Sequence, residues 1–165
     1  EAEPEHAARQ PQRPRPRVFV GGKGDRLLRL AARHADGWNT CWVWTPDAYS
    51  ERLRVLDEAC ASIGRDPATV WRTLGLYALC GTDERDLERR FDRLRADSPA
   101  GVLDGVDLAT FRVGRLVGTV DEVRDQVRGW EGLGVDTLVL GAGAVPFQVS
   151  ANDDLELLLD ACVNT

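Results

Sequence analysis

A glycine-rich loop, GGKGDR at residues 21–26, is the segment of this chain best suited to binding chemistry. It follows a short apolar run at 18–20 and precedes a stretch whose apolar residues have helical spacing. Glycines let the backbone approach a ligand, and free amides at a helix start attract anions. The loop predicts a phosphate site; from spacing alone, a tight turn without a ligand is equally compatible. The residues of this candidate site are Gly21, Gly22, Lys23, Gly24 and Asp25.

The same loop does not match a dinucleotide-binding fingerprint. That fingerprint needs a third glycine where this chain has Leu27, and an acidic residue at the end of the next strand. Neither is present, so the spacing argues against a Rossmann-type site.

Residues that could act as nucleophile, acid or base form no constellation. The serines are scattered, His6 lies in a proline-rich segment, and His34 falls late in a predicted helix, where histidine is usually structural. We therefore assign no catalytic residue and no metal site. Neither a zinc pattern nor a dense disulfide framework matches the spacing of the cysteines, Cys41, Cys60, Cys80 and Cys162, which we expect to be buried free thiols in a reducing cytoplasm.

Composition excludes several classes of protein. The 165 residues are 43% hydrophobic and 29% charged, which is typical of a globular domain. The net charge is −6 with interleaved signs, so nucleic acid is not an expected partner. The longest nearly uncharged stretch, 138–149, is too short for a membrane helix. The chain begins at Glu1 without Met or a secretory signal, so we expect a cytoplasmic fragment or processed product.

Strands and helices are predicted to alternate along the chain. Between 98 and 115 glycines and a proline interrupt the pattern, and only a short helix at 108–112 is expected there. The apolar β-rich runs predict strands at 18–20, 37–40, 70–80 and 136–141, and helical spacing predicts helices at about 25–34, 45–64, 82–94, 119–134 and 150–162.

Capping residues predict where the helices start. Thr45 followed by Pro46 is a favourable N-cap and first helical residue, and Thr119 with Glu122 forms a capping box. The other expected caps are Asp25, Thr82 and a second box from Ser150 to Asp153.

Four consecutive βα units fit two α/β folds: a small doubly wound sheet, or half of a (βα)8 barrel, whose usual length is about 250 residues. The missing start favours half a barrel. We expect a proline-rich linker or lead-in at 1–17 and the half-barrel at 18–165.

The block PRPRVFVGGKGDRLLRLAARHADGWN at 14–39 resembles the middle of the bacterial luciferase-like monooxygenase family. Two later blocks, GTVDEV at 118–123 and GVDTL at 134–138, resemble the last helix and strand of the same family. The resemblance covers about residues 14–162. It implies a TIM-like barrel that binds FMN or the deazaflavin F420 at the carboxyl ends of its strands, with this chain as strands five to eight.

The resemblance also implies which residues hold the cofactor. The family's loop after strand five binds the cofactor phosphate through backbone amides, which corresponds here to residues 21–25. Lys23 stands where a small residue is common, and it could add charge to the phosphate site or be solvated. Trp38 and Asn39, at the end of the second strand, could line the cofactor mouth or pack in the core. Gly141, among small residues at the end of the last strand, leaves room for a ring system.

The function implied is an F420- or FMN-dependent oxidoreductase acting on a small organic substrate, by hydride transfer or oxygen activation. We prefer F420 and hydride transfer, because the blocks at 21–24 and 35–39 are more similar to those of deazaflavin users. The competing interpretation is a non-enzymatic half-barrel that binds a phosphorylated ligand or acts as an assembly partner.

A half-barrel cannot close its hydrogen-bond ladder, and its outer strands would expose unpaired backbone beside an apolar surface. We therefore expect the N-terminal half of the same barrel as a partner, with a second copy of this chain as the alternative. The isolated chain is expected to be inactive, because the other half would carry most substrate-orienting groups.

Overall fold

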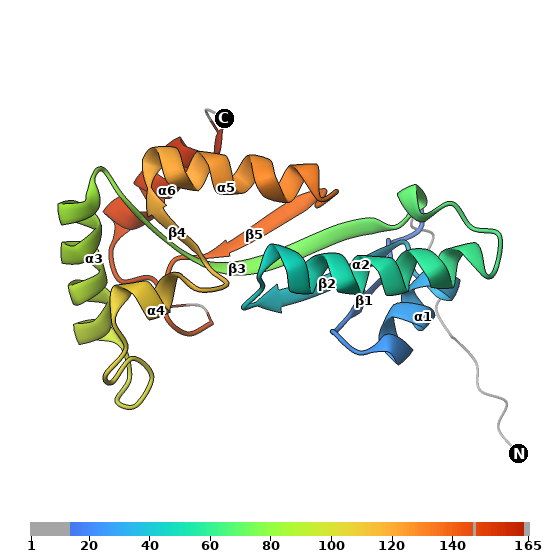
Figure 1. Ribbon diagram of the computed structural model, residues 1–165, viewed down its shortest axis with the longest axis horizontal. Helices are drawn as coiled ribbons and strands as arrows, with labels where there is room; N and C mark the ends of the chain where they lie inside the picture. The colour runs from blue at the N-terminus through green and yellow to red at the C-terminus, as the bar shows by residue number, and fades with distance from the viewer. Residues whose placement is uncertain (1–13, 147, 164–165) are drawn as a thin grey trace, which may run out of the picture.

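The computed structural model describes residues 14–146 and 148–163. Its framework is a sheet of parallel strands that alternate with helices (Figure 1). The strands are β1 (Phe19–Gly21), β2 (Gly37–Trp42), β3 (Trp71–Gly81), β4 (Leu116–Thr119) and β5 (Thr137–Gly141). The predicted strands correspond to β1, β2, β3 and β5, so the expected parallel α/β fold is confirmed.

β3 is long enough to pair with three other strands. Its first half lies between β2 and β5, and its last residues, Ala78–Gly81, pair with β4. β4 is the strand that the sequence pattern did not predict. It has four residues, one of them Gly118, and offers too short a pattern to recognise; its partner strand stabilises it.

The helices include the predicted short helix, at its predicted bounds. They are α1 (Asp25–His34), α2 (Pro46–Ala61), α3 (Glu84–Asp97), α4 (Leu108–Arg112), α5 (Val120–Gly132) and α6 (Asn152–Val163), with a 3₁₀ turn η1 (Pro67–Thr69). Two predicted helix starts are confirmed. The Thr45 hydroxyl accepts the Ala48 amide, and both bonds of the Thr119–Glu122 capping box are present.

The other three expected caps are wrong, two of them at α1 and α6. Gly24, not Asp25, is the N-cap of α1, because the Asp25 carboxylate accepts a hydrogen bond from Arg52 instead. α6 begins at Asn152, and the Ser150 hydroxyl is buried with no hydrogen-bond partner in the described part of the chain.

α3 is capped by Asp83 instead of the expected Thr82. The amide and hydroxyl of Thr82 both donate to the Asp86 carboxylate, which makes Thr82 part of a buried ionic cluster. In that cluster Arg90 donates to Asp86 at 2.9 Å and to Asp154 of α6 at 2.7 Å. The cluster therefore joins α3 to α6.

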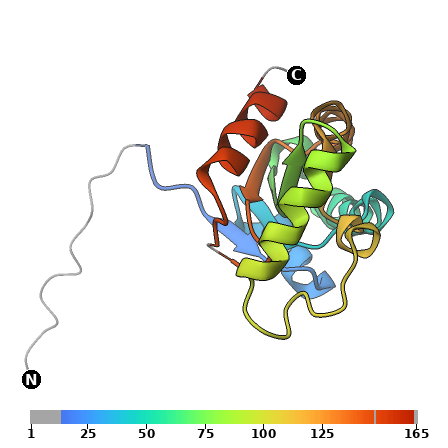
Figure 2. The ribbon, with the colours of Figure 1, turned by 90° about the vertical axis from the view of Figure 1, so that its left-hand side faces the viewer.

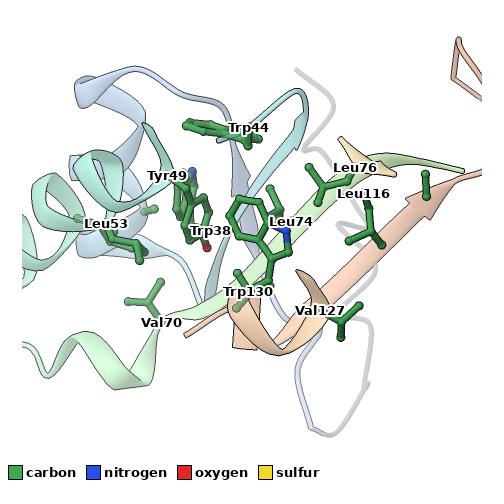
Figure 3. Close-up of a cluster of buried hydrophobic side chains, with 14 of the residues drawn as sticks. Trp38, Trp44, Tyr49, Leu53, Val70, Leu74, Leu76, Leu116, Val127 and Trp130 are labelled. Carbon is green, nitrogen blue, oxygen red and sulfur yellow. The ribbon is translucent and has the colours of Figure 1, made fainter. Parts of the chain in front are cut away.

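Four helices, α1, α2, α5 and α6, cover one face of β2, β3 and β5. They share one buried cluster with the strands, and its centre is aromatic. Trp38 stacks on Tyr49 with ring centroids 5.4 Å apart, while Trp44 and Trp130 meet Tyr49 edge-on (Figure 3). This packing orients the loops that follow β1 and β2.

The opposite face of β1, β2, β5 and the first half of β3 carries no helix in the described residues. Alternate side chains project from it, among them Phe19, Trp71 and Val139, which are 40%, 39% and 57% exposed. A doubly wound sheet has helices on both faces. The uncovered face therefore does not fit that alternative.

A second, smaller core lies at the far end of β3. Figure 2 looks toward α3, which lies across this end of the sheet. The core contains Leu79, Leu87, Phe91, Leu94, Leu103, Phe111 and Val117. It anchors the segment that returns from α3 through α4 to β4.

Of the expected lead-in at 1–17, only residues 14–17 are described; they have no regular secondary structure, and Arg15 pairs with Asp36 at 2.7 Å. None of the four cysteines forms a disulfide within the described residues; Cys60 and Cys80 are buried, while Cys41 and Cys162 are half-buried. Among the described residues, no cluster of ligating side chains could hold a metal ion. No helix in this part of the chain has the length and apolar content that a membrane span requires.

Candidate functional site

A cavity of about 430 Å³ lies at the carboxyl ends of β1 and β2. The loop after β1 forms one side of it, and the end of β2 forms the other. This is where parallel α/β sheets usually bind ligands. Its lining residues are Gly21, Gly22, Lys23, Asn39, Thr40, Cys41, Trp42 and Val43.

Gly22 shapes the first side of the cavity. Its φ of +137° is strained for any residue with a side chain, and a Cβ there would collide with Leu27. Its amide donates to the Asn39 carbonyl at 3.0 Å, which ties the loop to β2. The glycine is therefore required by the fold of the loop itself.

Gly24 and Asp25 start α1. No side chain caps this helix, and the amides of Leu27 and Leu28 both donate to the Gly24 carbonyl. A Cβ at Gly24 would meet nothing within 4 Å, so the space beside it is open. The Asp25 carboxylate pairs with Arg52 of α2 at 2.7 Å, so its amide, not its carboxylate, belongs to the predicted anion site.

Lys23 connects the two sides of the cavity. Its ammonium group donates to the Val43 carbonyl at 3.2 Å and lies 4.4 Å from the centre of the Trp44 ring. The sequence left open whether this side chain adds charge at a phosphate or is simply solvated. The structure shows a third arrangement, in which Lys23 holds the loop after β1 against the loop after β2.

Trp38 does not line the cavity; of the two possibilities that the sequence left open, the cofactor mouth and the core, the structure shows packing in the core. The side chain is fully buried in the helix-side core, because successive strand residues point to opposite faces and Asn39 takes the other one. Trp38 contacts the site from beneath: its Nε1 donates to the Gly22 carbonyl at 2.7 Å.

Asn39 is exposed and lines the cavity. Its side-chain oxygen accepts a hydrogen bond from the Thr73 hydroxyl at 2.8 Å. Thr73 lies on the neighbouring strand, so this bond fixes the orientation of the amide within the uncovered face.

An aromatic pair extends the β2 side of the cavity: Trp42 lines it, and Tyr77, which the sequence analysis did not single out, stacks on Trp42. The rings of Trp42 and Tyr77 are stacked with centroids 4.9 Å apart. Gly141, at the end of β5, lies against both, and a Cβ there would stand 3.6 Å from Tyr77 and 3.8 Å from Trp42. Burial raises the pKa of the Tyr77 hydroxyl, and nearby Arg115 opposes that shift. The signal that could have found Tyr77 is strand alternation, which puts it on the same face as Thr73.

The lining residues contain no carboxylate and no histidine. The arrangement offers backbone amides, an amide side chain and aromatic surface to a ligand. Such groups can bind and orient a cofactor that carries the reactive chemistry.

Comparison with known proteins identifies the family. The model of the luciferase-like monooxygenase family matches residues 1–137. The chain belongs to the luciferase-like monooxygenase family. The family resemblance seen in the loop and strand blocks is thereby confirmed, and the family's enzymes are oxidoreductases and monooxygenases.

Two mycobacterial relatives within this luciferase-like group are oxidoreductases by name. A phthiodiolone/phenolphthiodiolone dimycocerosates ketoreductase of Mycobacterium sp. (strain JLS) is 27% identical over 77 residues, covering 47% of this chain and 20% of the relative. An F420-dependent hydroxymycolic acid dehydrogenase of Mycobacterium tuberculosis is 28% identical over 146 residues, 84% of this chain and 38% of the relative.

Solved structures share the luciferase-like fold. The coenzyme F420 dependent tetrahydromethanopterin reductase of Methanopyrus kandleri superimposes with a TM-score of 0.60 at 18% identity, covering 88% of this chain and 49% of that one. Monooxygenases of known structure align as well, with TM-scores of 0.59 and 0.66. The chain thus spans from a fifth to about half of the length of these relatives and structures.

Proposed function

We propose that this chain is the cofactor-binding part of an F420-dependent oxidoreductase that transfers a hydride to or from a small organic substrate. The observation that carries the proposal is the cavity between the Gly22 loop and the end of β2, at the carboxyl edge of a parallel sheet. The F420-dependent relative and the F420-dependent reductase of similar fold support the choice of cofactor. FMN is the alternative, because a flavin phosphate could bind to the same groups.

The residues present fit such a cofactor. Its phosphate would be held by the amides of residues 23–25, because the Gly22 amide already donates to the Asn39 carbonyl; α1 starts there without a side-chain cap and the space at Gly24 is open. Asn39 would contact the cofactor from the uncovered face, and Gly141 would leave space at the far side. When bound, the deazaflavin supplies the hydride-accepting or hydride-donating ring. The protein's part is to fix the phosphate, orient the substrate and exclude water.

The substrate class we propose is a carbonyl compound or the corresponding alcohol. A ketoreductase and a hydroxymycolic acid dehydrogenase are among the relatives, and both names describe that interconversion. In this interconversion the carbonyl carbon would take up a hydride and its oxygen a proton to give the alcohol, and a bound reduced deazaflavin would supply the hydride. No residue of this chain is assigned as the proton donor.

The uncovered face of the sheet needs a partner. Phe19, Trp71 and Val139 expose apolar surface there, and β1 and β5 each have an unpaired outer edge in the described residues. We propose that the N-terminal half of the same barrel covers this face, and that this chain contributes strands five to eight and is inactive alone. Native mass spectrometry tests the arrangement: a dimer of this chain would favour self-pairing instead, and a stable, well-folded monomer would contradict both.

The cofactor proposal is tested by titrating the whole protein with F420 and with FMN while following fluorescence. We expect saturable binding of F420 that is tighter than that of FMN. Tighter binding of FMN would shift the assignment to the flavin. Binding of neither would overturn the enzyme assignment and favour a half-barrel that serves another phosphorylated ligand or an assembly.

A further inference from the structure

The side chain of Trp42 projects from the opposite face of the sheet to the one that its position in β2 predicts. Trp38 and Thr40 point into the core under the helices, so alternation places Trp42 on that side as well. Its ring lies on the opposite, uncovered face. Tyr77 and Gly141 contact the ring there. Both project from the uncovered face, because the residues before them, Leu76 and Leu140, pack into the helix-side core.

The backbone explains the reversal. Trp42 has a φ of +93°, and among the described non-glycine residues it alone has a positive φ. That conformation is uncommon for a bulky residue and tends to persist only where the surroundings hold it in place. Here β3 holds the strand as far as Trp42, which pairs with Leu76, and the Trp44 amide donates to the Gly114 carbonyl at 2.9 Å just beyond it.

The result is a flat aromatic surface beside the cavity. Trp42 lines the cavity itself, and stacking on Tyr77 fixes the plane of its ring. Gly141 contributes no side chain against the pair; Tyr77 is buried and Trp42 is half-buried, so Trp42 supplies the accessible ring. The pair lies on β2 and β3, and the proposed phosphate loop follows β1. Because adjacent strands are about 4.8 Å apart, the pair stands one to two strand spacings from that loop.

We propose that Trp42, supported by Tyr77, is a specificity-determining residue that binds a flat apolar group of the substrate. This inference rests on the proposed function and adds to it the substrate class: a carbonyl compound or alcohol with an aromatic or similarly flat apolar substituent. Aromatic rings stack on such surfaces with a geometry that simple apolar burial does not provide. A ligand that stacks on the Trp42 ring accounts for the strained backbone that brings this ring to the cavity.

Substitutions at Trp42 test the proposal. Trp42→Gly removes the ring and suits the positive φ, whereas Trp42→Phe keeps an aromatic surface. Acetophenone and acetone serve as a flat and a small ketone, and two readouts are used on the whole protein: reduction by reduced F420, and calorimetric binding of each ketone without cofactor. We expect Trp42→Gly to lower the preference for acetophenone over acetone at least tenfold, mainly through KM, and Trp42→Phe to retain most of it.

Affinity for F420 separates the substrate role from a cofactor role. Because Trp42 also lines the cavity proposed for the cofactor, this affinity should fall in Trp42→Gly by much less than the affinity for acetophenone, and Trp42→Phe should retain most of it. An unchanged ketone preference in Trp42→Gly, or a loss of F420 affinity as large as the loss of acetophenone affinity, would overturn the proposal. If thermal melts show that Trp42→Gly does not fold, Tyr77→Leu removes the supporting ring and carries the same expectation. If the wild type binds neither F420 nor FMN, the proposed function fails, while calorimetry still decides whether Trp42 binds the flat ketone.

Discussion

The indole nitrogen of Trp38 donates a hydrogen bond of 2.7 Å to the carbonyl of Gly22. This bond links the buried aromatic cluster around Tyr49 to the glycine loop that lines the cavity. The geometry of the loop therefore depends on a residue that never touches the cavity.

Trp38→Phe should remove this bond while keeping a buried ring. Because the Gly22 carbonyl loses its donor, we expect a destabilisation of about 1–2 kcal/mol and several-fold weaker cofactor binding. Trp130→Phe is the matched control, since Trp130 packs against the same Tyr49 ring from α5. Urea unfolding and fluorescence titration of the whole protein measure the two effects. Equal cofactor affinities in the two variants would show that the bond does not position the loop.

The two glycines of the loop should respond differently to valine. Gly22→Val places a branched side chain at a φ of +137° and against Leu27, so the loop itself must distort. Gly24 has ordinary extended backbone and open space, so Gly24→Val should leave stability nearly unchanged. If the amides of 23–25 bind the cofactor phosphate and Gly22 shapes the loop that presents them, both variants should bind F420 at least tenfold more weakly. Wild-type affinity in both would exclude the loop as the phosphate site.

Gly81 is required by close packing at the end of β3. A Cβ there would stand 2.5 Å from the Leu87 amide nitrogen and 2.6 Å from the Leu87 Cβ, so Gly81→Ala should destabilise the chain by roughly 1–3 kcal/mol. Gly129 lies inside α5, where an added Cβ would meet nothing within 4 Å, and Gly129→Ala should stabilise the chain by up to about 1 kcal/mol. Thermal unfolding compares them. The prediction is contradicted if both substitutions change the stability in the same direction.

Arg90 should matter far more than its neighbour Arg89. The Arg90 side chain is 9% exposed and pairs with the buried carboxylates of Asp86 and Asp154. Arg90→Met strands those charges and should cost about 3–5 kcal/mol. Arg89 also pairs with Asp86, but its side chain is 74% exposed, so Arg89→Met should cost less than about 1 kcal/mol. Chemical denaturation of both variants checks the difference, and similar losses would refute a buried network.

Acid should weaken the same cluster. Burial acts to raise the pKa of Asp86, but hydrogen bonds from the Thr82 amide and Arg90 outweigh it and lower that pKa to about 2, from 3.8. The folded state therefore favours the carboxylate, and its contribution of roughly 2 kcal/mol is present above about pH 4 and is lost as the pH falls toward 2. The gap in unfolding free energy between wild type and Asp86→Asn should narrow between pH 5 and about pH 2. A constant gap would show that the pKa of Asp86 is not lowered.

Local sequence determined most of the secondary structure, because the rules that govern it act over a few residues. Thr45 with Pro46, and Thr119 with Glu122, start their helices as the spacing predicts, and the helix at 108–112 has its predicted bounds. Where a side chain found a distant partner, the local rule failed. Asp25 pairs with Arg52 instead of capping α1. Similarly, β4 exists because β3 pairs with it.

The sequence by itself also predicted the loop that lines the cavity, since residues 21–25 follow a strand and start a helix. It did not determine which side chains surround the ligand. Strand alternation separates Trp38 from Asn39 and leaves only Asn39 at the cavity, and Lys23 bridges to Val43 and Trp44 through contacts about twenty residues away. Trp42 does not follow strand alternation, because its positive φ turns the side chain to the opposite face. Such a conformation costs free energy locally, so only the packing of neighbouring strands and loops, absent from any short stretch of sequence, can select it.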